Sequence, residues 1–441
     1  MFRSVVVTVA FVLSASSASL AQDTARMEQV IQSHVSAGTF MGTVLVARDG
    51  ATVLDKAYGM ANLELDVPNT PDTKFRLGSI TKQFTAASIL LLEERGKLKI
   101  DDRVKTYLPD APMAWDRITV FNLLTHTSGI PNFTSFADYN TIKLSSRTAD
   151  ALVGAVRDRA LDFGPGEKMS YSNSGYVVLG AIIEKVSGQS FEAFVADNIF
   201  TPLRMKDSGY DSNTAVIKHR ASGYIKGPAG YVNAGYIHMS IPHAAGALYS
   251  TTRDLLKWEQ ALFGGKVVSK ASLDRMITPF KNDYGLGLTS SLVKGRRVIA
   301  HGGGIDGFNT QLAYYPDSRT VIAVLSNVNG SVPDVLARQL GALMHGESVT
   351  LPSERTEITL PAATLSKYVG AYELSPAATM TITLEGDRLM AQLTGQGKNQ
   401  IFAQTETLFF LKVIDAQLEF APDASSLVLH QNGRDQKAGR R

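Results

Sequence analysis

Two residues near the amino end of the chain have the types and the spacing for nucleophilic catalysis. The segment Gly78-Ser79-Ile80-Thr81-Lys82 places a hydroxyl and an amine three positions apart at the start of an apolar helical pattern. Residues three apart on a helix are neighbours, so the Lys82 amine can lie beside the Ser79 hydroxyl. A serine hydroxyl is a weak nucleophile at neutral pH and needs such a base. The motif alone is weak, because a helix-capping Ser79 and a solvated Lys82 explain it as well.

Two further motifs strengthen this interpretation. The first, Tyr171-Ser172-Asn173, supplies a phenol and an amide just before a helical segment. The second, His301-Gly302-Gly303-Gly304, ends a strand-like run. Three glycines remove side-chain bulk where a substrate backbone could lie along the strand edge. Taken singly, Tyr171 could be a core aromatic residue and the glycines a turn.

In this order the motifs resemble those of the serine β-lactamase and penicillin-binding-protein superfamily, in particular the class C β-lactamase-like hydrolases. That family carries Ser-x-x-Lys, Tyr-x-Asn and Lys/His/Trp-x-Gly, matched here by Ser79 and Lys82, Tyr171 and Asn173, and His301 and Gly303. Two other segments, 123–131 and 246–255, are also similar to family signatures. The resemblance covers about residues 27–345. It implies an α+β fold in which helices and a helical subdomain flank an antiparallel sheet.

The resemblance also implies a two-step acyl transfer through an acyl-enzyme on Ser79. Tyr171 and Lys82 would move the proton, and either of them could be the general base, with coupled titrations. Asn173 would hold Lys82 and a substrate amide. The backbone N–H groups of Ser79 and Gly304 would form the oxyanion hole. His301 is a further candidate catalytic residue, and Gly302 and Gly303 are candidate substrate-binding positions.

The third motif departs from the lactamase pattern. Lactamases of this class usually have Lys-Thr-Gly there, whereas this chain has a histidine with only a partial charge near neutral pH. We therefore expect a peptidase or amidase that acts on peptides containing D-amino acids, of the D-Ala carboxypeptidase or D-aminopeptidase kind. The alternatives are a carboxylesterase on short acyl esters, with weak or no β-lactamase activity, and a penicillin- or peptidoglycan-binding protein with vestigial chemistry. The expected ligand is a small peptide, an ester or a β-lactam-like molecule.

The elements that must position these residues follow from the hydrophobic patterns. Strand-like runs at 42–48 and 52–58 flank Asp49-Gly50, a strong hairpin signal, and further runs occur at 297–301, 309–315 and 320–327. Strands at both ends with helices between them predict one α+β domain over residues 22–345. Residues 346–361 read as a linker. The segment Tyr368-Val369-Gly370-Ala371-Tyr372 resembles the start of a lipocalin-like domain, expected over 362–441 with about five strands, an incomplete barrel and a frayed tail after 433.

Composition and termini exclude several classes of protein. The chain has no Cys, so disulfides, thiolate metal sites and a cysteine nucleophile are impossible, and its net charge of +3 gives no footprint for nucleic acid. Residues 1–21 read as a signal peptide, which predicts export, a periplasmic location and no membrane span after cleavage. We expect no cofactor and no metal, and the sequence gives no indication of oligomeric state. The glycine-interleaved Tyr224, Tyr231 and Tyr236 are candidates for an aromatic wall of the cleft or for a packed surface loop.

Overall fold

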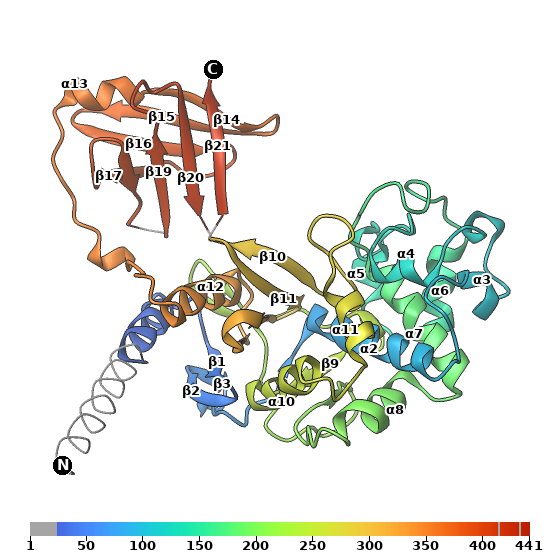
Figure 1. The fold of residues 1–441 in the computed structure, drawn as a ribbon. Coiled ribbons are helices and arrows are strands. Elements are labelled where there is room, and N and C mark those ends of the chain that lie inside the picture. Colours follow the sequence, from blue (N-terminus) through green and yellow to red (C-terminus); the bar gives the residue numbers. More distant parts are fainter. Residues whose placement is uncertain (1–23, 413–414, 432–433) are drawn as a thin grey trace, which may run out of the picture. The chain divides into compact units, whose positions relative to one another are not determined.

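The computed structural model describes residues 24–412, 415–431 and 434–441, and the chain divides into two compact units between Met344 and His345 (Figure 1). The predicted signal peptide, residues 1–21, lies outside the described residues. Among the helices that are described, none has the length and apolar content needed to cross a membrane.

A six-stranded antiparallel sheet forms the centre of the first unit. Its strand order is β10-β11-β12-β13-β1-β2. The strands are β1 (Gly42–Arg48), β2 (Ala51–Tyr58), β10 (Thr289–Val293), β11 (Arg296–Ile305), β12 (Phe308–Tyr315) and β13 (Thr320–Ser326). The pairing of β1 with β13, in register from Gly42 with Ser326 to Arg48 with Thr320, joins the two ends of the unit. The predicted α+β architecture is therefore confirmed.

Helices cover both faces of this sheet. Successive strand residues point to opposite faces, and the neighbours Tyr314 and Tyr315 show which helix lies on which face. The Tyr314 ring stacks on Phe263 of α10 (Thr252–Phe263) with centroids 3.8 Å apart. Tyr315 instead lies against Gly341 of α12 (Val332–Met344), where a Cβ would be 2.0 Å from its hydroxyl. Helices α10 and α12 thus pack on opposite sides of the sheet.

The remaining helices build the subdomain that carries two of the three motifs. Helix α7 (Asn173–Ser187) packs against α2 (Thr81–Glu94), α4 (Val120–Leu124), α6 (Ala149–Arg157) and α9 (His243–Gly246). The smaller helices are α3 (Val104–Tyr107), α5 (Tyr139–Ile142), α8 (Phe191–Val195) and α11 (Lys270–Ile277). Short strands complete the unit: β3 (Met60–Asn62), β4 (Val67–Pro68), β5 (Phe75–Arg76), β6 (Gly209–Tyr210), β7 (Tyr224–Gly227), β8 (Gly230–Asn233) and β9 (Leu248–Ser250).

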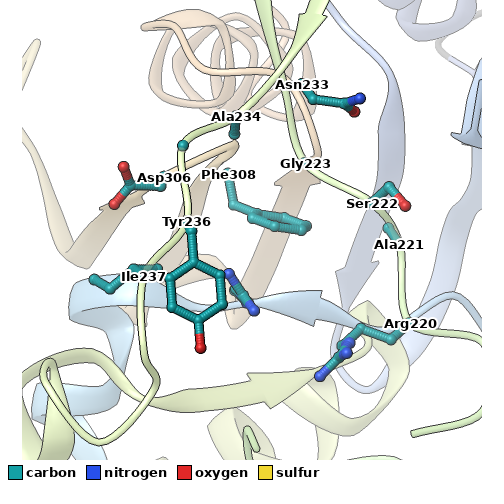
Figure 2. Close-up of a pocket in the computed structure, with 12 residues that line it drawn as sticks. Arg220, Ala221, Ser222, Gly223, Asn233, Ala234, Tyr236, Ile237, Asp306 and Phe308 are labelled. Carbon is teal, nitrogen blue, oxygen red and sulfur yellow. The ribbon is translucent and has the colours of Figure 1, made fainter. Parts of the chain in front are cut away.

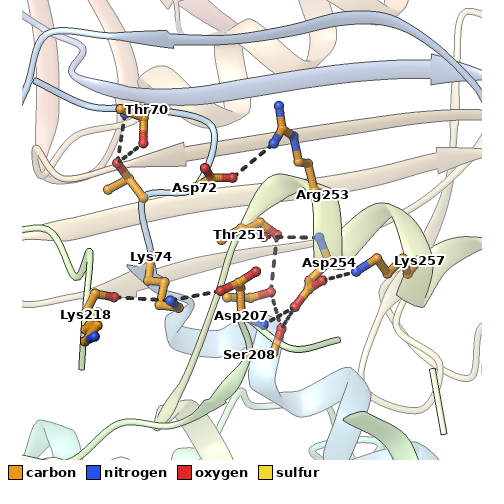
Figure 3. Close-up of polar contacts among 12 residues, drawn as sticks. Thr70, Asp72, Lys74, Asp207, Ser208, Lys218, Thr251, Arg253, Asp254 and Lys257 are labelled. Carbon is orange, nitrogen blue, oxygen red and sulfur yellow. Dashed lines mark hydrogen bonds and ion pairs between the residues drawn. The ribbon is translucent and has the colours of Figure 1, made fainter. Parts of the chain in front are cut away.

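The second family-like segment, 246–255, holds the start of α10 in place. Thr251 caps the helix by accepting a hydrogen bond from the Asp254 N–H at 3.2 Å. The buried Asp254 carboxylate in turn accepts from the Ser208 hydroxyl at 2.9 Å and pairs with Lys257 at 2.7 Å (Figure 3). These contacts give the segment a structural role, because it anchors the chain that leads from α9 through β9 into α10.

The second unit is a closed β-barrel. Its eight strands pair in sequence order, and β14 also pairs with β21 to close the circle. The helix α13 (Ala362–Leu365) precedes the strands β14 (Gly370–Ser375), β15 (Ala378–Glu385), β16 (Arg388–Leu393), β17 (Asn399–Ala403), β18 (Leu408–Phe410), β19 (Ala416–Phe420), β20 (Ser426–Gln431) and β21 (Arg434–Arg440). A lipocalin-like all-β domain is confirmed, but the prediction of five strands and an incomplete barrel is wrong. The expected frayed tail is also wrong, since β21 pairs with β20 from Arg434 to Gly439.

Candidate active site

Ser79 lies at the junction between a 3₁₀ turn and a buried helix. The turn Gly78–Ile80 leads directly into α2. Gly78 has a φ of +54°, and a Cβ at this position would lie 2.8 Å from the backbone nitrogen of Gly304. Any side chain here would be strained and would also collide with β11. This glycine therefore allows Ser79 to lie against the carboxyl end of β11.

The Lys82 amine is fixed by three short contacts. Its Nζ lies 2.9 Å from Ser79 Oγ, 2.9 Å from Asn173 Oδ1 and 2.8 Å from the carbonyl oxygen of Ala245. The three partners belong to the turn before α2, to α7 and to α9. The amide nitrogen of Asn173 donates to Thr134 Oγ1 at 3.3 Å, which orients its oxygen towards Lys82. The structure thus brings the first two sequence motifs together around one amine.

Tyr171 completes this group immediately before α7. The Lys82 Nζ lies 4.8 Å from the centre of its ring, and the Ser79 side chain acts on its phenol, whose pKa it lowers. His126 packs against the same ring with centroids 4.2 Å apart. The Nδ1 atom of His126 accepts a hydrogen bond from the Ser172 N–H at 3.1 Å, so this histidine positions the Tyr171 segment.

Burial sets the protonation of both groups. Lys82 is fully buried because α2 is covered on nearly all sides, and this burial lowers the pKa of Lys82 well below its usual value. Burial also raises the pKa of Tyr171, and the hydrogen bond with Ser79 offsets this only in part. Tyr171 as a whole is 37% exposed, but its hydroxyl end lies against Ser79, and the pKa of this buried hydroxyl is therefore raised. A neutral amine and a protonated phenol are the favoured states.

The three contacts of Lys82 suit an ammonium as well as a neutral amine, and it is burial that favours the neutral form. A neutral amine has two N–H groups and one lone pair, whereas an ammonium has three N–H groups and no lone pair. The Asn173 Oδ1 and the Ala245 carbonyl oxygen can only accept, so they take both N–H groups. When burial keeps the amine neutral, its lone pair is left to accept the O–H of Ser79, whose Oγ lies 2.9 Å away. Of the two general bases that the sequence left open, this arrangement favours Lys82.

His301 lies beside the site but is occupied by structural contacts. Its Nδ1 lies 2.6 Å from the carbonyl oxygen of Gly302 and therefore donates, while its Nε2 accepts from the Tyr284 hydroxyl at 3.0 Å. Burial, and then the nearby Lys82, lower the pKa of His301 to about 4, although the Gly302 hydrogen bond acts in the opposite direction. The expected partial charge at neutral pH is therefore wrong. We assign His301 a positioning role in place of the predicted catalytic one.

The three glycines of the third motif have different surroundings and therefore different roles. A Cβ at Gly303 would lie 1.9 Å from the Leu77 carbonyl oxygen, so this glycine is needed for packing against the chain before Ser79. A Cβ at Gly302 would lie 2.7 Å from the Gln311 side chain. Gly304 is exposed, and its backbone nitrogen lies against the Gly78 turn. The predicted oxyanion donors, the N–H groups of Ser79 and Gly304, are therefore close neighbours.

Only one of the three candidate tyrosines lines a cavity. Tyr224 is 2% exposed and donates to the Glu64 carboxylate at 2.6 Å, and Tyr231 packs on the cluster that contains Tyr224. Both side chains are thus used in packing, which favours the packed surface loop over the aromatic wall for Tyr224 and Tyr231. Tyr236 is 53% exposed and lines a cavity of about 380 Å³ with Asp306 (Figure 2).

Sequence reasoning missed the backbone carbonyl of Ala245 and the side chain of Tyr284. A carbonyl has no residue-type signal, although Ala245 directly precedes the family-like segment 246–255. Tyr284 lies in a loop that carries no motif and reaches the site through its contacts with His301 and with the ring of Tyr171. Within the described residues, no group of three or more His, Asp or Glu side chains could hold a metal ion.

Comparison with known proteins places the chain in a family. The family model described as Beta-lactamase matches residues 27–344, which is most of the chain. The chain belongs to this family of β-lactamases and penicillin-binding proteins. It is accordingly a serine hydrolase of a family whose members act on peptide and β-lactam-type substrates. A second model, described as a domain of unknown function (DUF3471), matches residues 354–432.

Individual relatives support this assignment along the whole chain. "Penicillin-binding protein 4*" of Bacillus subtilis (strain 168) is 31% identical over 433 residues, which cover 91% of this chain and 95% of that protein. The solved structure of an octameric penicillin-binding protein homologue from Pyrococcus abyssi covers 94% of this chain and 99% of its own, with 26% identity and a TM-score of 0.68. The D-amino acid amidase from Ochrobactrum anthropi SV3, solved with L-phenylalanine amide, covers 74% of this chain and 100% of its own, with 26% identity and a TM-score of 0.66.

Proposed function

We propose that this serine hydrolase cleaves amide bonds next to D-amino acids in small peptides or amides, through an acyl-enzyme on Ser79. The observation that carries the proposal is the fully buried Lys82 amine, which lies 2.9 Å from Ser79 Oγ and is held there by Asn173 and the Ala245 carbonyl oxygen. We also propose that residues 1–21 direct export to the periplasm.

The mechanism follows from the favoured protonation states. The Lys82 amine takes the Ser79 proton as Oγ attacks the acyl carbon, and the N–H groups of Ser79 and Gly304 stabilise the oxyanion. The Tyr171 phenol then gives its proton to the departing amine and regains one from the Lys82 ammonium. Water attacks the acyl-enzyme in the second step. Lys82 accepts the proton of that water and returns it to Ser79 Oγ.

The neutral third motif supports an amidase or aminopeptidase over a carboxypeptidase. A terminal carboxylate on the leaving group, like the carboxylate of a β-lactam, is best met by a cation or a hydroxyl. This motif offers the uncharged His301 and two glycines instead. A relative of similar fold is named as a D-amino acid amidase, which supports the same substrate class. Short acyl esters are the second candidate substrates, because a Lys-activated serine needs no particular leaving group to attack them.

Turnover of a small panel of substrates tests the proposal. The purified protein is incubated with D- and L-phenylalanine amide, a D-Ala-D-Ala peptide, short p-nitrophenyl esters and a chromogenic cephalosporin, with Ser79→Ala as the control. We expect the D-amide to be hydrolysed faster than the L-amide and the Ser79→Ala variant to be inactive. Turnover of the esters alone would identify an esterase. A stable adduct on Ser79 by mass spectrometry, without any turnover, would identify a binding protein with vestigial chemistry.

A further inference from the structure

A charged cavity adjoins the acyl side of the candidate active site. Its walls include Asp306 and Phe308 at the β11–β12 turn, Arg76 of β5 and the segments 220–223 and 233–237 (Figure 2). Arg76 precedes Ser79 by only three positions. Asp306 follows Gly304 by two positions, or about 7 Å along an extended strand. Residues that line the cavity are therefore two and three positions along the chain from the proposed oxyanion donors.

The position of Tyr171 shows which side of the scissile bond the cavity serves. Tyr171, the proposed proton donor to the leaving group, lies beside His301, with ring centroids 6.3 Å apart. His301 is at the opposite end of the glycine stretch from Asp306. A substrate that lies along this strand therefore has its leaving group near His301 and its acyl chain directed towards Asp306 and the cavity.

Two arginines share one buried carboxylate at the cavity wall. Asp211 is fully buried, and its oxygens accept from Arg76 Nε at 2.6 Å and from Arg220 Nη1 at 2.5 Å. Arg220 Nη1 also donates to the Ser212 carbonyl oxygen at 2.9 Å. In the part of the chain that the structure describes, no acceptor meets the two terminal nitrogens of Arg76 or the Nη2 of Arg220. Several N–H groups at the cavity wall are thus available to a ligand.

The charges around the cavity sum to a net positive value. The two guanidinium groups and the single Asp211 carboxylate together carry a net charge of +1. The ion pair of Lys143 with Asp306, at 2.5 Å, adds no net charge. The side chains of Arg76, Arg220, Lys143 and Asp306 are all less than one third exposed, so solvent screens these charges only in part. Phe308, whose ring centre lies 5.7 Å from the Arg76 guanidinium, adds an apolar wall.

We propose that this cavity binds a carboxylate carried on the acyl side of the substrate, through the free N–H groups of Arg76 and Arg220. The guanidinium group matches a carboxylate in geometry and can bind it with two parallel hydrogen bonds. The apolar wall and the exposed Tyr236 suit the short chain that carries the carboxylate. The inference rests on the proposed acyl-enzyme at Ser79 and extends it to a preference for acidic acyl groups.

A pair of matched esters tests the proposal independently of D-amino acids. The mono-p-nitrophenyl ester of adipic acid ends in a carboxylate, and the corresponding ester of adipamic acid ends in a neutral amide of the same length. The readout is the ratio of kcat/KM for the acid over the amide, which is insensitive to a general loss of active protein. We expect a ratio of at least tenfold in the wild type. A ratio near one would overturn the proposal.

Three variants assign the preference to the cavity. Arg220→Gln removes its net charge and should lower the ratio at least fivefold, while Asp306→Asn adds net positive charge and should raise it. The matched control is Arg275→Gln on α11, which removes an ion pair with Glu93 and should leave the ratio unchanged. If Arg220→Gln does not fold, the Asp306→Asn variant alone tests the proposal, through the expected rise in the ratio of kcat/KM. An unchanged ratio in both cavity variants would contradict the proposal.

Binding to the Ser79→Ala variant gives a readout that needs no turnover. Monomethyl adipate and its neutral amide, methyl adipamate, are compared by calorimetry, and the acid should bind at least tenfold more tightly. Equal binding of the acid and the amide would refute the cavity proposal even if D-amides are hydrolysed. Conversely, tighter binding of the acid in a protein that hydrolyses no D-amide would refute the proposed function and leave the cavity assignment in place.

Discussion

Replacing Tyr171 by Phe separates the two possible general bases, provided that the leaving group is varied at the same time. An amide releases an amine, which must be protonated as it leaves, whereas a p-nitrophenyl ester releases a stable anion that needs no proton. If Lys82 is the base, the Tyr171 hydroxyl is required only for the amide. If the Tyr171 phenolate is the base, both substrates need it equally.

The expected magnitude follows from the burial of the phenol. An unperturbed tyrosine, with a pKa of about 10, is ionised in about one molecule in a thousand at pH 7. Burial raises the pKa of Tyr171 further, so forming its phenolate at pH 7 costs more than about 4 kcal/mol. The amine of Lys82, whose pKa burial lowers, has no such barrier. We expect Tyr171→Phe to slow acylation by the ester less than about tenfold and cleavage of the amide by about 10²–10⁴-fold.

Stopped-flow release of p-nitrophenolate measures acylation by the ester, and ammonia release measures cleavage of the amide. Circular dichroism and the thermal midpoint of the variant check that the fold is retained, which we expect because only one hydroxyl is removed from a residue that is 37% exposed. An equal loss of a thousandfold or more with both substrates would refute the assignment of Lys82 as the base.

Three other predictions concern charge and closure. In Asn173→Asp a carboxylate would lie about 2.9 Å from Lys82 Nζ, and at an effective dielectric constant of about 20 the attraction is about 6 kcal/mol. The pKa of Lys82 should rise by at least about two units after solvation of the new carboxylate is allowed for, so the acid limb of the kcat/KM profile should move to higher pH; a profile like that of the wild type would contradict this. Burial raises the pKa of Glu259 from its usual 4.5 to about 8, so the folded state takes up a proton and loses stability as pH rises between these values, by about 1.4 kcal/mol per unit. Urea unfolding of Glu259→Gln should show a smaller fall over this range, and an identical slope would be the contrary result. Deleting residues 434–441 removes β21 and leaves one edge of β14 and one edge of β20 without a partner strand. Limited proteolysis should then cut residues 345–431 much faster than in the full chain, and unchanged resistance would show that the barrel does not depend on this strand.

The hydrolase sheet was predictable because its local signals and its topology agree. Asp49 and Gly50 both have positive φ, 51° and 82°, which is the turn that an Asp-Gly pair favours in a two-residue hairpin. The barrel was harder to predict. Strand β21 reads as a solvated tail because it is rich in charged residues, although Ala438 is fully buried. It is held by backbone pairing with β14 and β20, which residue types do not reveal.

The same division applies to the site. Spacing along a helix was enough to predict the contact between Ser79 and Lys82, and the motif order led to Asn173. The pKa directions could not be predicted, because the burial of Lys82 depends on α7 and α9, which come far later in the chain. The aromatic composition of the segment 224–236 was misleading, since two of its tyrosines are used in packing and only Tyr236 lines the cavity.

The place of β1 in the sheet has a consequence for biosynthesis. This early strand lies between β2 and β13. Its second edge can pair only after β13 has been synthesised, because Gly42 pairs with Ser326. Contacts between such distant positions form slowly, because a long loop has to close first. A ribosome therefore releases nearly the whole hydrolase unit before its central sheet can be finished. This late completion of the sheet is compatible with the proposed export, because a secretion channel takes chains that have not yet folded.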